Sequence, residues 1–437
     1  MNQQYPLPPV GSVIAMNGNM LRATATGLTL GDIVSIPVQP LLTSESGTAF
    51  AQAKVVAYEN DIYSLSLFTN RARILPKTPL YFACQNNISF YSANLLGSVI
   101  DPLGNIVKKY TAPIAYERND LIDLRAAATP PAVFDRGIIK KQFASGLRVI
   151  DGLLSIGYGQ RIAIFAEPGV GKSTLMSQIA NYSAANINII ALIGERGREV
   201  VEMFEGDLND NAKHKTIGVV STSDQSALSR ITAAHTATRL AQYYAQQGKN
   251  VLLQIDSLTR LFRAYREVGI ASGETPVRRG YPPSVFADLP DLIERAGVTQ
   301  SGSVTALYTV LLSSDLDEDP MVDEIKGLTD GHFILRKDLA ERGHFPAIDP
   351  LSSLSRLANK LMDREQHQAV LNFLRHWQTL QNADELMALG GEQNAELKHA
   401  LKHQEQLRAF LQQSTTDCSK PCDTRQALIS LSNQLLS

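Results

Sequence analysis

The chain has 437 residues, of which 44% are hydrophobic, and its formal net charge is −2 at pH 7. This length is enough for two or three domains, and the apolar content excludes a wholly disordered chain. The balanced charge gives no global basic field for nucleic acid, and three cysteines are too few for a disulfide framework. No apolar run is long enough for a membrane span and no secretory signal is visible, so we expect a reduced, soluble, cytoplasmic protein.

Residues 1–85 are predicted to form an N-terminal β-barrel. Short apolar segments alternate with turn signals such as Asn17-Gly18-Asn19, and this spacing is typical of a small antiparallel barrel. No phosphate-binding or acid–base arrangement occurs before residue 160, so we expect this domain to serve assembly. The predicted strands are Val13–Ala15, Met20–Ala25, Ile33–Ile36, Lys54–Tyr58, Ile62–Phe68 and Leu80–Phe82.

Residues 86–360 are predicted to form a second domain, of the α/β class, with a largely parallel sheet. Apolar strands alternate with helical stretches such as Ser226–Gln247, which is the order expected when helices connect parallel strands. The predicted strands are Arg161–Ala166, Ile187–Ile193, Thr216–Ser221, Val251–Ile255, Val304–Leu312 and His332–Leu335.

Residues 361–437 are predicted to form a C-terminal helical domain, because Phe373, Trp377 and Leu380 recur at helical spacing. This segment holds four of the eight histidines. Metal binding is one interpretation, but dispersed histidines on polar helix faces are favoured. Cys418 and Cys422 are not expected to bind zinc, because no second cysteine pair and no histidine at ligand spacing completes the site.

One motif carries phosphate chemistry. Residues 162–174 read IAIFAEPGVGKST, an apolar strand that leads into a glycine-bearing loop and then a helix, which is the context of a phosphate-binding loop, or P-loop. Gly169 and Gly171 allow backbone N–H groups to turn toward phosphate oxygens. Lys172 is expected to reach the β- and γ-phosphates of ATP, and the Ser173 hydroxyl to bind Mg²⁺. The predicted nucleotide-binding residues of the loop are Glu167, Pro168, Gly169, Val170, Gly171, Lys172, Ser173 and Thr174.

The loop departs from the usual pattern at its beginning. Ala166 stands where the pattern has its first glycine, but this position ends the strand, so alanine costs little if its φ is negative. Glu167 and Pro168 vary the loop interior, and Glu167 adds a negative charge near the phosphates. The sequence does not explain that choice.

Two carboxylates follow predicted strands. Asp256 comes directly after a buried strand, where an acid can hold the water shell of Mg²⁺. Glu195 follows the second strand of the sheet, and such strand ends face the nucleotide crevice. A carboxylate there can polarise the attacking water, and the adjacent Arg196 can sense the γ-phosphate. The alternative for Glu195 and Arg196 is a surface ion pair of little energetic worth.

Several motifs together resemble the ATPases of type III protein export, which are relatives of the catalytic subunit of rotary F-type ATP synthase. The resemblance covers residues 95–356 densely and is weak at both ends. The motifs are GERGREV, DSLTR, RRGYPPSVF, LIERAG, YTVLL and ERGHFPAIDPLSSLSR.

This resemblance implies a RecA-like P-loop core and Mg-ATP hydrolysis between the subunits of a homohexamer. It implies catalytic roles for Lys172, for Glu195, which activates water, and for Arg196 at the γ-phosphate. It implies that Arg356 reaches a neighbouring subunit's nucleotide and that Phe345 stacks on adenine in place of the usual tyrosine. Ser173 and Asp256 are the implied metal residues.

The resemblance also implies where the protein acts and with what. The expected location is the cytoplasmic face of the inner membrane, and the expected task is to release chaperones and to unfold and hand over secreted proteins. The implied partners are stator or regulator proteins, a central stalk, chaperone–substrate complexes and the export gate, with no nucleic acid. The loop 269–283 resembles the segment that faces the central stalk, although a plain surface loop is an alternative.

Other interpretations remain open at this point. A flagellar export ATPase is hard to separate from the injectisome ATPase, which two sequence stretches favour: SGETPVRRGYPPSVF and DLDEDPMVDEI. A Rho-like RNA motor would need a basic, aromatic N-terminal platform, which the near-neutral first 85 residues do not provide. A non-catalytic nucleotide-binding subunit has no need of Glu195. Arg260, Arg263 and Arg266 share one helix face, which is either solvated or a subunit or channel contact.

Overall fold

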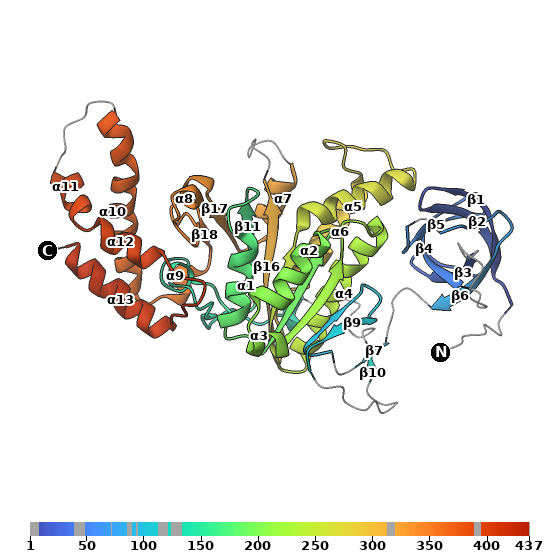
Figure 1. Ribbon diagram of the computed structural model, residues 1–437, viewed down its shortest axis with the longest axis horizontal. Helices are drawn as coiled ribbons and strands as arrows, with labels where there is room; N and C mark the ends of the chain where they lie inside the picture. The colour runs from blue at the N-terminus through green and yellow to red at the C-terminus, as the bar shows by residue number, and fades with distance from the viewer. Residues whose placement is uncertain are drawn as a thin grey trace.

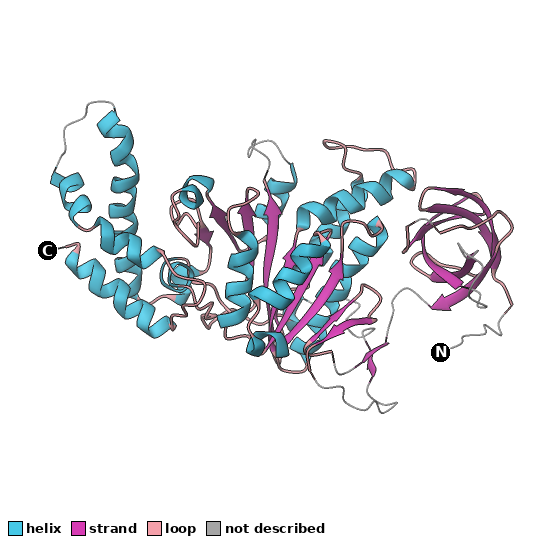
Figure 2. Cartoon of the chain, viewed as in Figure 1, coloured by secondary structure: helices cyan, strands magenta, loops and turns pink. Residues whose placement is uncertain are grey.

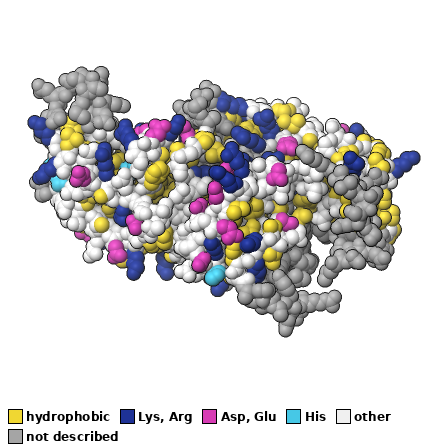
Figure 3. All heavy atoms as spheres, viewed as in Figure 1, with side chains coloured by type: hydrophobic (Ala, Val, Ile, Leu, Met, Phe, Trp, Pro, Cys, Tyr) yellow, Lys and Arg dark blue, Asp and Glu magenta, His cyan; other side chains and the backbone are white. Residues whose placement is uncertain are grey.

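The computed structural model has three parts in a row, with the N-terminal barrel and the C-terminal helices at opposite ends of the α/β core (Figure 1). On the face shown in Figure 3, basic and acidic side chains are interspersed, in keeping with the balanced net charge. Among the described residues, none of the helices combines the length and the apolar character needed to cross a membrane. The structure describes residues 8–38, 49–70, 72–84, 90–92, 95–111, 121–123, 133–312, 320–388 and 395–436.

The predicted N-terminal barrel is confirmed. Six antiparallel strands close in the order β1-β2-β5-β4-β3-β6. Alternate residues point inward, so that Leu21, Val34 and Leu65 are fully buried in the barrel core. The strands are β1 (Gly11–Asn17), β2 (Met20–Ala25), β3 (Ile33–Val38), β4 (Ala49–Glu59), β5 (Ile62–Leu67) and β6 (Pro79–Cys84).

The predicted parallel sheet of the core is also confirmed. Its central strands run parallel in the order β17-β11-β16-β14-β12-β13 (Figure 2). Helices cover both faces, which explains why β12 is buried along its whole length and has no polar alternation. These strands are β11 (Arg161–Ala166), β12 (Ile187–Ile193), β13 (Thr216–Ser221), β14 (Asn250–Asp256), β16 (Ser303–Leu311) and β17 (Gly331–Leu335).

Short strands extend the sheet beyond what the sequence predicted. They have only two to four residues, too few for a periodic pattern. At the edges of the sheet are β8 (Ser98–Ile100), β9 (Ile106–Lys109) and β18 (Leu354–Ser355); β15 (Gly297–Val298) pairs with β16, and β7 (Phe90–Ser92) with β10 (Leu121–Asp123) forms a separate two-stranded sheet.

The two faces of the sheet pack against different helices. Phe165 of β11 lies in a cluster with α4, α5, α6 and α7, whereas its neighbour Ile164 lies in a cluster with α1 and the C-terminal helices. Ser226 caps α4, because its side chain accepts a hydrogen bond from the N–H of Ser229. The helices are α1 (Lys172–Tyr182), α2 (Gly197–Val201), α3 (Asp210–His214), α4 (Ala227–Gln246), α5 (Leu258–Ala271), α6 (Pro283–Glu294), α7 (Pro320–Leu328), α8 (Lys337–Glu341) and α9 (Ala358–Leu361), with π-helical turns at Val149–Leu153 and Glu202–Asp207 and a 3-10 turn at Val133–Asp135.

The C-terminal region is helical, as predicted. Phe373 and Trp377 bury against the core face that also holds α1. Three histidines come together here and are not dispersed as expected: the ring centroids of His376 and His399 are 5.6 Å apart, and those of His399 and His403 are 5.0 Å apart. The helices are α10 (Arg364–Ala388), α11 (Ala395–Lys402), α12 (Gln404–Leu411) and α13 (Pro421–Gln434).

Candidate active site

The P-loop connects the carboxyl end of β11 to the first turn of α1. Gly169 and Gly171 have φ values of 84° and 88°, a left-handed conformation that favours glycine. Gly171 is the N-cap of α1, so the positive end of the helix dipole lies at the loop. Val170 is buried and holds the loop against the core, while Ser173 and Thr174 are exposed on the first turn of α1. The loop is therefore shaped to receive an anion.

Lys172 joins the two carboxylates that follow the neighbouring strands. Its ammonium contacts Asp256 Oδ1 and lies 3.7 Å from Glu195 Oε1. Asp256 ends β14 and Glu195 follows β12, and these strands are adjacent and parallel, so both side chains reach the same edge of the sheet. Thr309 of β16 donates a 2.7 Å hydrogen bond to Asp256 Oδ1. The residues are brought together as the sequence predicted, with Thr309 as an addition.

Glu195 has the environment of a proton acceptor. Its side chain is only 4% exposed, and burial, together with Glu199 and Asp256, raises its pKa to about 7. Lys172 and Arg260 act in the opposite direction. Glu195 Oε1 has no hydrogen-bond partner within the described residues. A buried carboxylate with a pKa near neutrality and an unused acceptor atom is suited to take a proton from water.

Arg260 belongs to this site, and the sequence did not identify it as such. It donates a 2.9 Å hydrogen bond to Glu195 Oε2 and another, of 2.5 Å, to the carbonyl oxygen of Gly194. Arg263 and Arg266, on the same helix, are exposed. Of the three arginines on this helix face, Arg260 therefore belongs to the site, whereas Arg263 and Arg266 lie at the surface. The position of Arg260, four residues after Asp256 on the helix that follows β14, was the available signal.

The residues present suit a magnesium ion. Ser173 and Asp256 offer a hydroxyl and a carboxylate oxygen, the hard donors that Mg²⁺ prefers. Within the described ranges, no group of three histidine, cysteine or acidic side chains could hold a metal by itself. This donor set therefore suits an ion that takes its remaining ligands from phosphates and water.

Phe345 lies beside the P-loop, whereas Arg196 points into solvent. A Cβ atom built on Gly171 would lie 3.4 Å from the Phe345 ring, and this ring is 45% exposed, so one face is available for stacking. The Phe345 carbonyl oxygen accepts a 2.9 Å hydrogen bond from the N–H of Gln413. The Arg196 side chain is 77% exposed and forms an ion pair with Glu199 at 3.6 Å.

Arg356 lies at the opposite edge of the sheet from its own P-loop. The carbonyl oxygen of Asp330 accepts a 3.0 Å hydrogen bond from the N–H of Arg356, and the Asp330 carboxylate accepts one from the N–H of Arg161, the first residue of β11. The P-loop begins at the other end of this strand, after Ala166. Five steps of about 3.3 Å put roughly 17 Å of strand between the two ends. The structure does not bring Arg356 to the other site residues.

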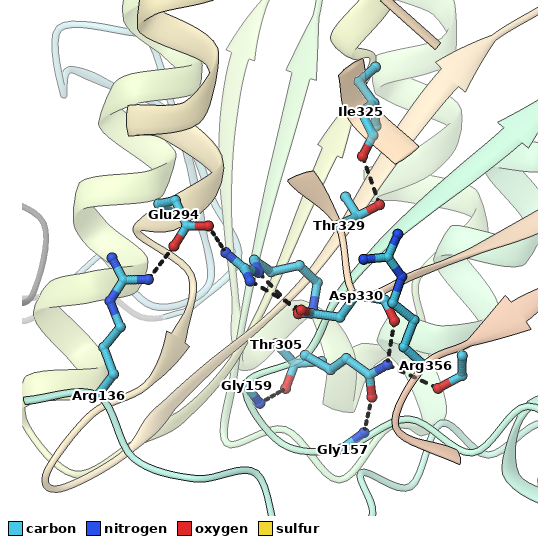
Figure 4. A network of polar contacts seen from close by, with 12 residues as sticks. Arg136, Gly157, Gly159, Glu294, Thr305, Ile325, Thr329, Asp330 and Arg356 are labelled. Carbon is cyan, nitrogen blue, oxygen red and sulfur yellow. Dashed lines mark hydrogen bonds and ion pairs between the residues drawn. The ribbon is translucent and has the colours of Figure 1, made fainter. Parts of the chain in front are cut away.

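A network of ion pairs lies beside Arg356 (Figure 4). Arg161 binds the Asp330 carboxylate with its Nε and Nη2 atoms, at 3.0 and 3.1 Å, and Glu294 Oε1 with Nη1, at 2.5 Å. Glu294 in turn contacts Arg136. The Arg356 guanidinium donates to the carbonyl oxygen of Lys326 at 3.1 Å. This network could not be predicted from the sequence, because its members lie far apart along the chain.

The chain is similar to secretion and flagellar ATPases along nearly its whole length. The model of the ATP synthase alpha/beta family, nucleotide-binding domain, matches residues 146–355, and that of the T3SS EscN ATPase C-terminal domain matches residues 362–430. The chain is 37% identical to the flagellum-specific ATP synthase of Bacillus subtilis, with 96% of this chain and 94% of the relative covered. It is 36% identical to the type 3 secretion system ATPase of Xanthomonas euvesicatoria, with 97% and 94% covered.

The fold is similar to a solved ATPase as well. The assembled ATPase EscN of the enteropathogenic E. coli type III secretion system superposes with a TM-score of 0.86 at 39% identity, covering 97% of this chain and 100% of EscN. EscN in complex with its central stalk EscO superposes with a TM-score of 0.84 at 38% identity, with the same coverage.

Proposed function

Because the chain belongs to the type III secretion ATPase family, we propose that it hydrolyses Mg-ATP at sites shared between neighbouring copies of a homohexamer. The protein is an ATP-hydrolysing enzyme associated with protein secretion. The observation that carries the site assignment is the cluster in which Lys172 meets Asp256 and Glu195 beside the P-loop. A P-loop lysine, a strand-end aspartate and a further carboxylate that can position water are the parts that nucleotide hydrolysis requires, and here they lie within reach of one another.

The binding step uses the loop and its neighbours. The N–H groups of residues 169–174 and the Lys172 ammonium hold the phosphates, and Phe345 offers its exposed ring face to the base. Ser173 and Asp256 are the residues that would hold Mg²⁺. The ion, when bound, neutralises charge that develops on the phosphate oxygens.

The hydrolytic step uses Glu195. A water molecule attacks the γ-phosphorus in line with the bond to ADP, that bond breaks, and the water's proton passes to Glu195 Oε1. Arg260 holds the other carboxylate oxygen and so fixes the orientation of the base. Arg356 of a neighbouring copy supplies positive charge, since it cannot reach the P-loop of its own chain. The exposed Arg196 contacts the γ-phosphate once nucleotide is bound.

The proposed setting is protein export. We place the homohexamer at the cytoplasmic face of the inner membrane, where it releases chaperones and hands unfolded proteins to an export gate under the control of stator proteins. A central stalk is the partner of the loop 269–283, which connects α5 to α6 and exposes Val277. Its support is that the similar ATPase EscN is assembled with its central stalk EscO. The similarity to a type 3 secretion system ATPase favours export over RNA translocation.

Two substitutions test the site. Lys172→Ala should abolish productive ATP binding, because the phosphates lose their buried charge partner. Glu195→Gln should bind nucleotide nearly normally and turn over slowly, because the amide keeps the shape of the side chain but cannot accept the proton. Titration with a fluorescent ATP analogue, alongside phosphate release, separates binding from turnover. Near-normal hydrolysis by the Glu195→Gln protein would remove Glu195 from its assigned role.

A further inference from the structure

A second polar pocket lies between the nucleotide-binding core and the C-terminal helices. Its volume is about 590 Å³, and none of residues 167–174 lines it. One wall is α8 with the residues on either side of it, and the other wall is formed by α10, α11 and α12. The volume is within the roughly 300–1,000 Å³ range of small-molecule sites.

Two buried rings in this pocket have unused nitrogen atoms. His344 and Trp377 are 5% and 4% exposed, and both line the pocket. His344 Nε2 and Trp377 Nε1 have no hydrogen-bond partner in the part of the chain that the structure describes. The ring centroids are 6.0 Å apart. Buried polar atoms are almost always paired, so two neighbouring unpaired nitrogens mark a place for a ligand atom.

The pocket carries positive charge. Three arginines line it (Arg336, Arg342 and Arg408) against one acidic residue, Asp338, which Arg336 binds with two hydrogen bonds of 2.8 Å. Burial and the nearby charge of Arg408 hold the pKa of His344 below its usual value, so the imidazole is neutral and adds no charge. Arg336 also pairs with the buried Asp349 at 3.6 Å, so three cations face two anions and one positive charge remains. That charge complements a phosphate group, which carries about −1.5 to −2 at pH 7.

We propose that this pocket binds a small phosphate-bearing anion that bridges the nucleotide-binding core and the C-terminal helices. The indole N–H of Trp377 and an imidazole N–H of His344 donate hydrogen bonds to the phosphate oxygens. The guanidinium group of Arg408, from the C-terminal side, adds a charge-assisted hydrogen bond. The remaining lining includes Leu339, Leu380 and Leu401, which suit the organic part of a phosphate ester.

The single tryptophan of the chain makes this site directly observable. Since Trp377 is the only tryptophan, its fluorescence reports on the pocket alone. Inorganic phosphate is titrated at constant ionic strength into the full-length Lys172→Ala protein, in which the P-loop has lost its main phosphate partner. We expect a saturable change in emission. A change that does not saturate, or no change with either phosphate or a phosphate ester, would overturn the proposal.

Matched variants locate the binding. Arg408→Gln in the same background should weaken phosphate binding by roughly tenfold or more, because a charge-assisted hydrogen bond is lost. Arg364→Gln is the control, since Arg364 lies on the same helix as Trp377 but does not line the pocket. Equal affinities of the two variants would exclude this pocket as the binding site.

Equilibrium dialysis with labelled phosphate tests the indole without relying on its fluorescence. Trp377→Phe keeps the aromatic packing but removes the Nε1 donor, so we expect weaker phosphate binding, and unchanged binding would contradict the proposed contact. Glucose 6-phosphate is the second probe. Tighter binding than inorganic phosphate identifies a phosphate ester as the ligand class, and equal binding identifies the phosphate group alone. Because all measurements use a Lys172→Ala background, their outcome is independent of the proposed catalytic roles.

Discussion

The central sheet has a carboxyl edge, where its parallel strands end, and an amino edge, where they begin. These two edges differ in how completely their polar groups are paired. At the carboxyl edge, Lys172 forms ion pairs with two carboxylates, and Oε1 of the buried Glu195 accepts no hydrogen bond from the described residues. At the amino edge, Arg161 has each nitrogen of its guanidinium on a carboxylate of Asp330 or Glu294. At the carboxyl edge, a polar atom is left that a ligand can bind, whereas at the amino edge the Arg161 guanidinium is fully paired within the chain.

This difference shows that one chain can carry two parts of a site, the P-loop cluster and Arg356, too far apart to form a complete site by themselves. The backbone N–H of Arg356 is hydrogen-bonded to the carbonyl oxygen of Asp330 at the amino edge, about a strand length from the P-loop. The ion pairs of Asp330 hold the backbone of Arg356 in place whether or not the same chain has bound nucleotide. Such a fixed position suits an arginine that acts on the nucleotide of a neighbouring copy.

The largest expected effect tests this separation. Arg356→Ala should lower hydrolysis by about 10³–10⁵-fold, as expected for an arginine that acts on a neighbour's phosphates, and should leave nucleotide binding to the isolated chain unchanged. Mixing this variant with Lys172→Ala should restore part of the activity, because some interfaces combine an intact loop with an intact arginine. Steady-state phosphate release over a range of mixing ratios measures the recovery. No recovery, with mixed assembly verified by mass, would place Arg356 in a structural role.

The second prediction concerns Arg260, which lies beside Glu195 at the carboxyl edge. Arg260→Gln removes a positive charge beside Glu195, which raises the pKa of that carboxyl further. The base is active when deprotonated, so activity near pH 7 should fall by roughly 10- to 100-fold and the acidic limb of the pH–rate profile should move to higher pH. Arg263→Gln is the matched control, since Arg263 is exposed one turn further along α5. A uniform loss of activity at every pH would mean that Arg260 only orients Glu195 and does not set the pKa of its carboxyl.

The amino edge should respond in stability and not in nucleotide binding. Asp330→Asn leaves the partly buried Arg161 without its main anionic partner, and losing hydrogen bonds to charged groups should cost about 1.5–3 kcal/mol of unfolding free energy. Urea unfolding measures this loss, and a fluorescent nucleotide measures affinity in the same protein. A large loss of affinity at unchanged stability would mean that the two edges are not separate in function.

The smallest effect concerns His235, which lies on α4 away from both edges and bonds to the Tyr265 hydroxyl at 2.7 Å. Burial, with the nearby charges of Lys54, Arg239 and Arg295, lowers the pKa of His235 to about 3. Its folded pKa is below its unfolded value of about 6.5, so the stability it contributes is present above that pH and is lost as the pH falls. Between pH 7 and pH 6 the loss should be about 0.7 kcal/mol. Urea unfolding of His235→Gln should lack this component, and an identical pH dependence would mean that His235 is already charged in the fold.

The sequence predicted the parts of the fold whose signals are local. The six barrel strands, the parallel core and the helical C-terminal region each have a repeating apolar pattern that the structure confirms. Strands of two to four residues, such as β18, were missed because so short a segment has no period. The clustering of His376, His399 and His403 was missed for another reason, since helices α10 and α11 bring together residues more than twenty positions apart.

By itself, the sequence determined the P-loop and the two carboxylates that follow strands, because glycines, a lysine and strand ends in fixed order specify that geometry locally. Only the tertiary structure decided which side chains meet. It brought Arg260 and Thr309 to the carboxylates, and it placed Arg356 a strand length from its own P-loop. The physical reason is that contacts across a sheet depend on strand order and register, and neither is written in the spacing of residues along one strand.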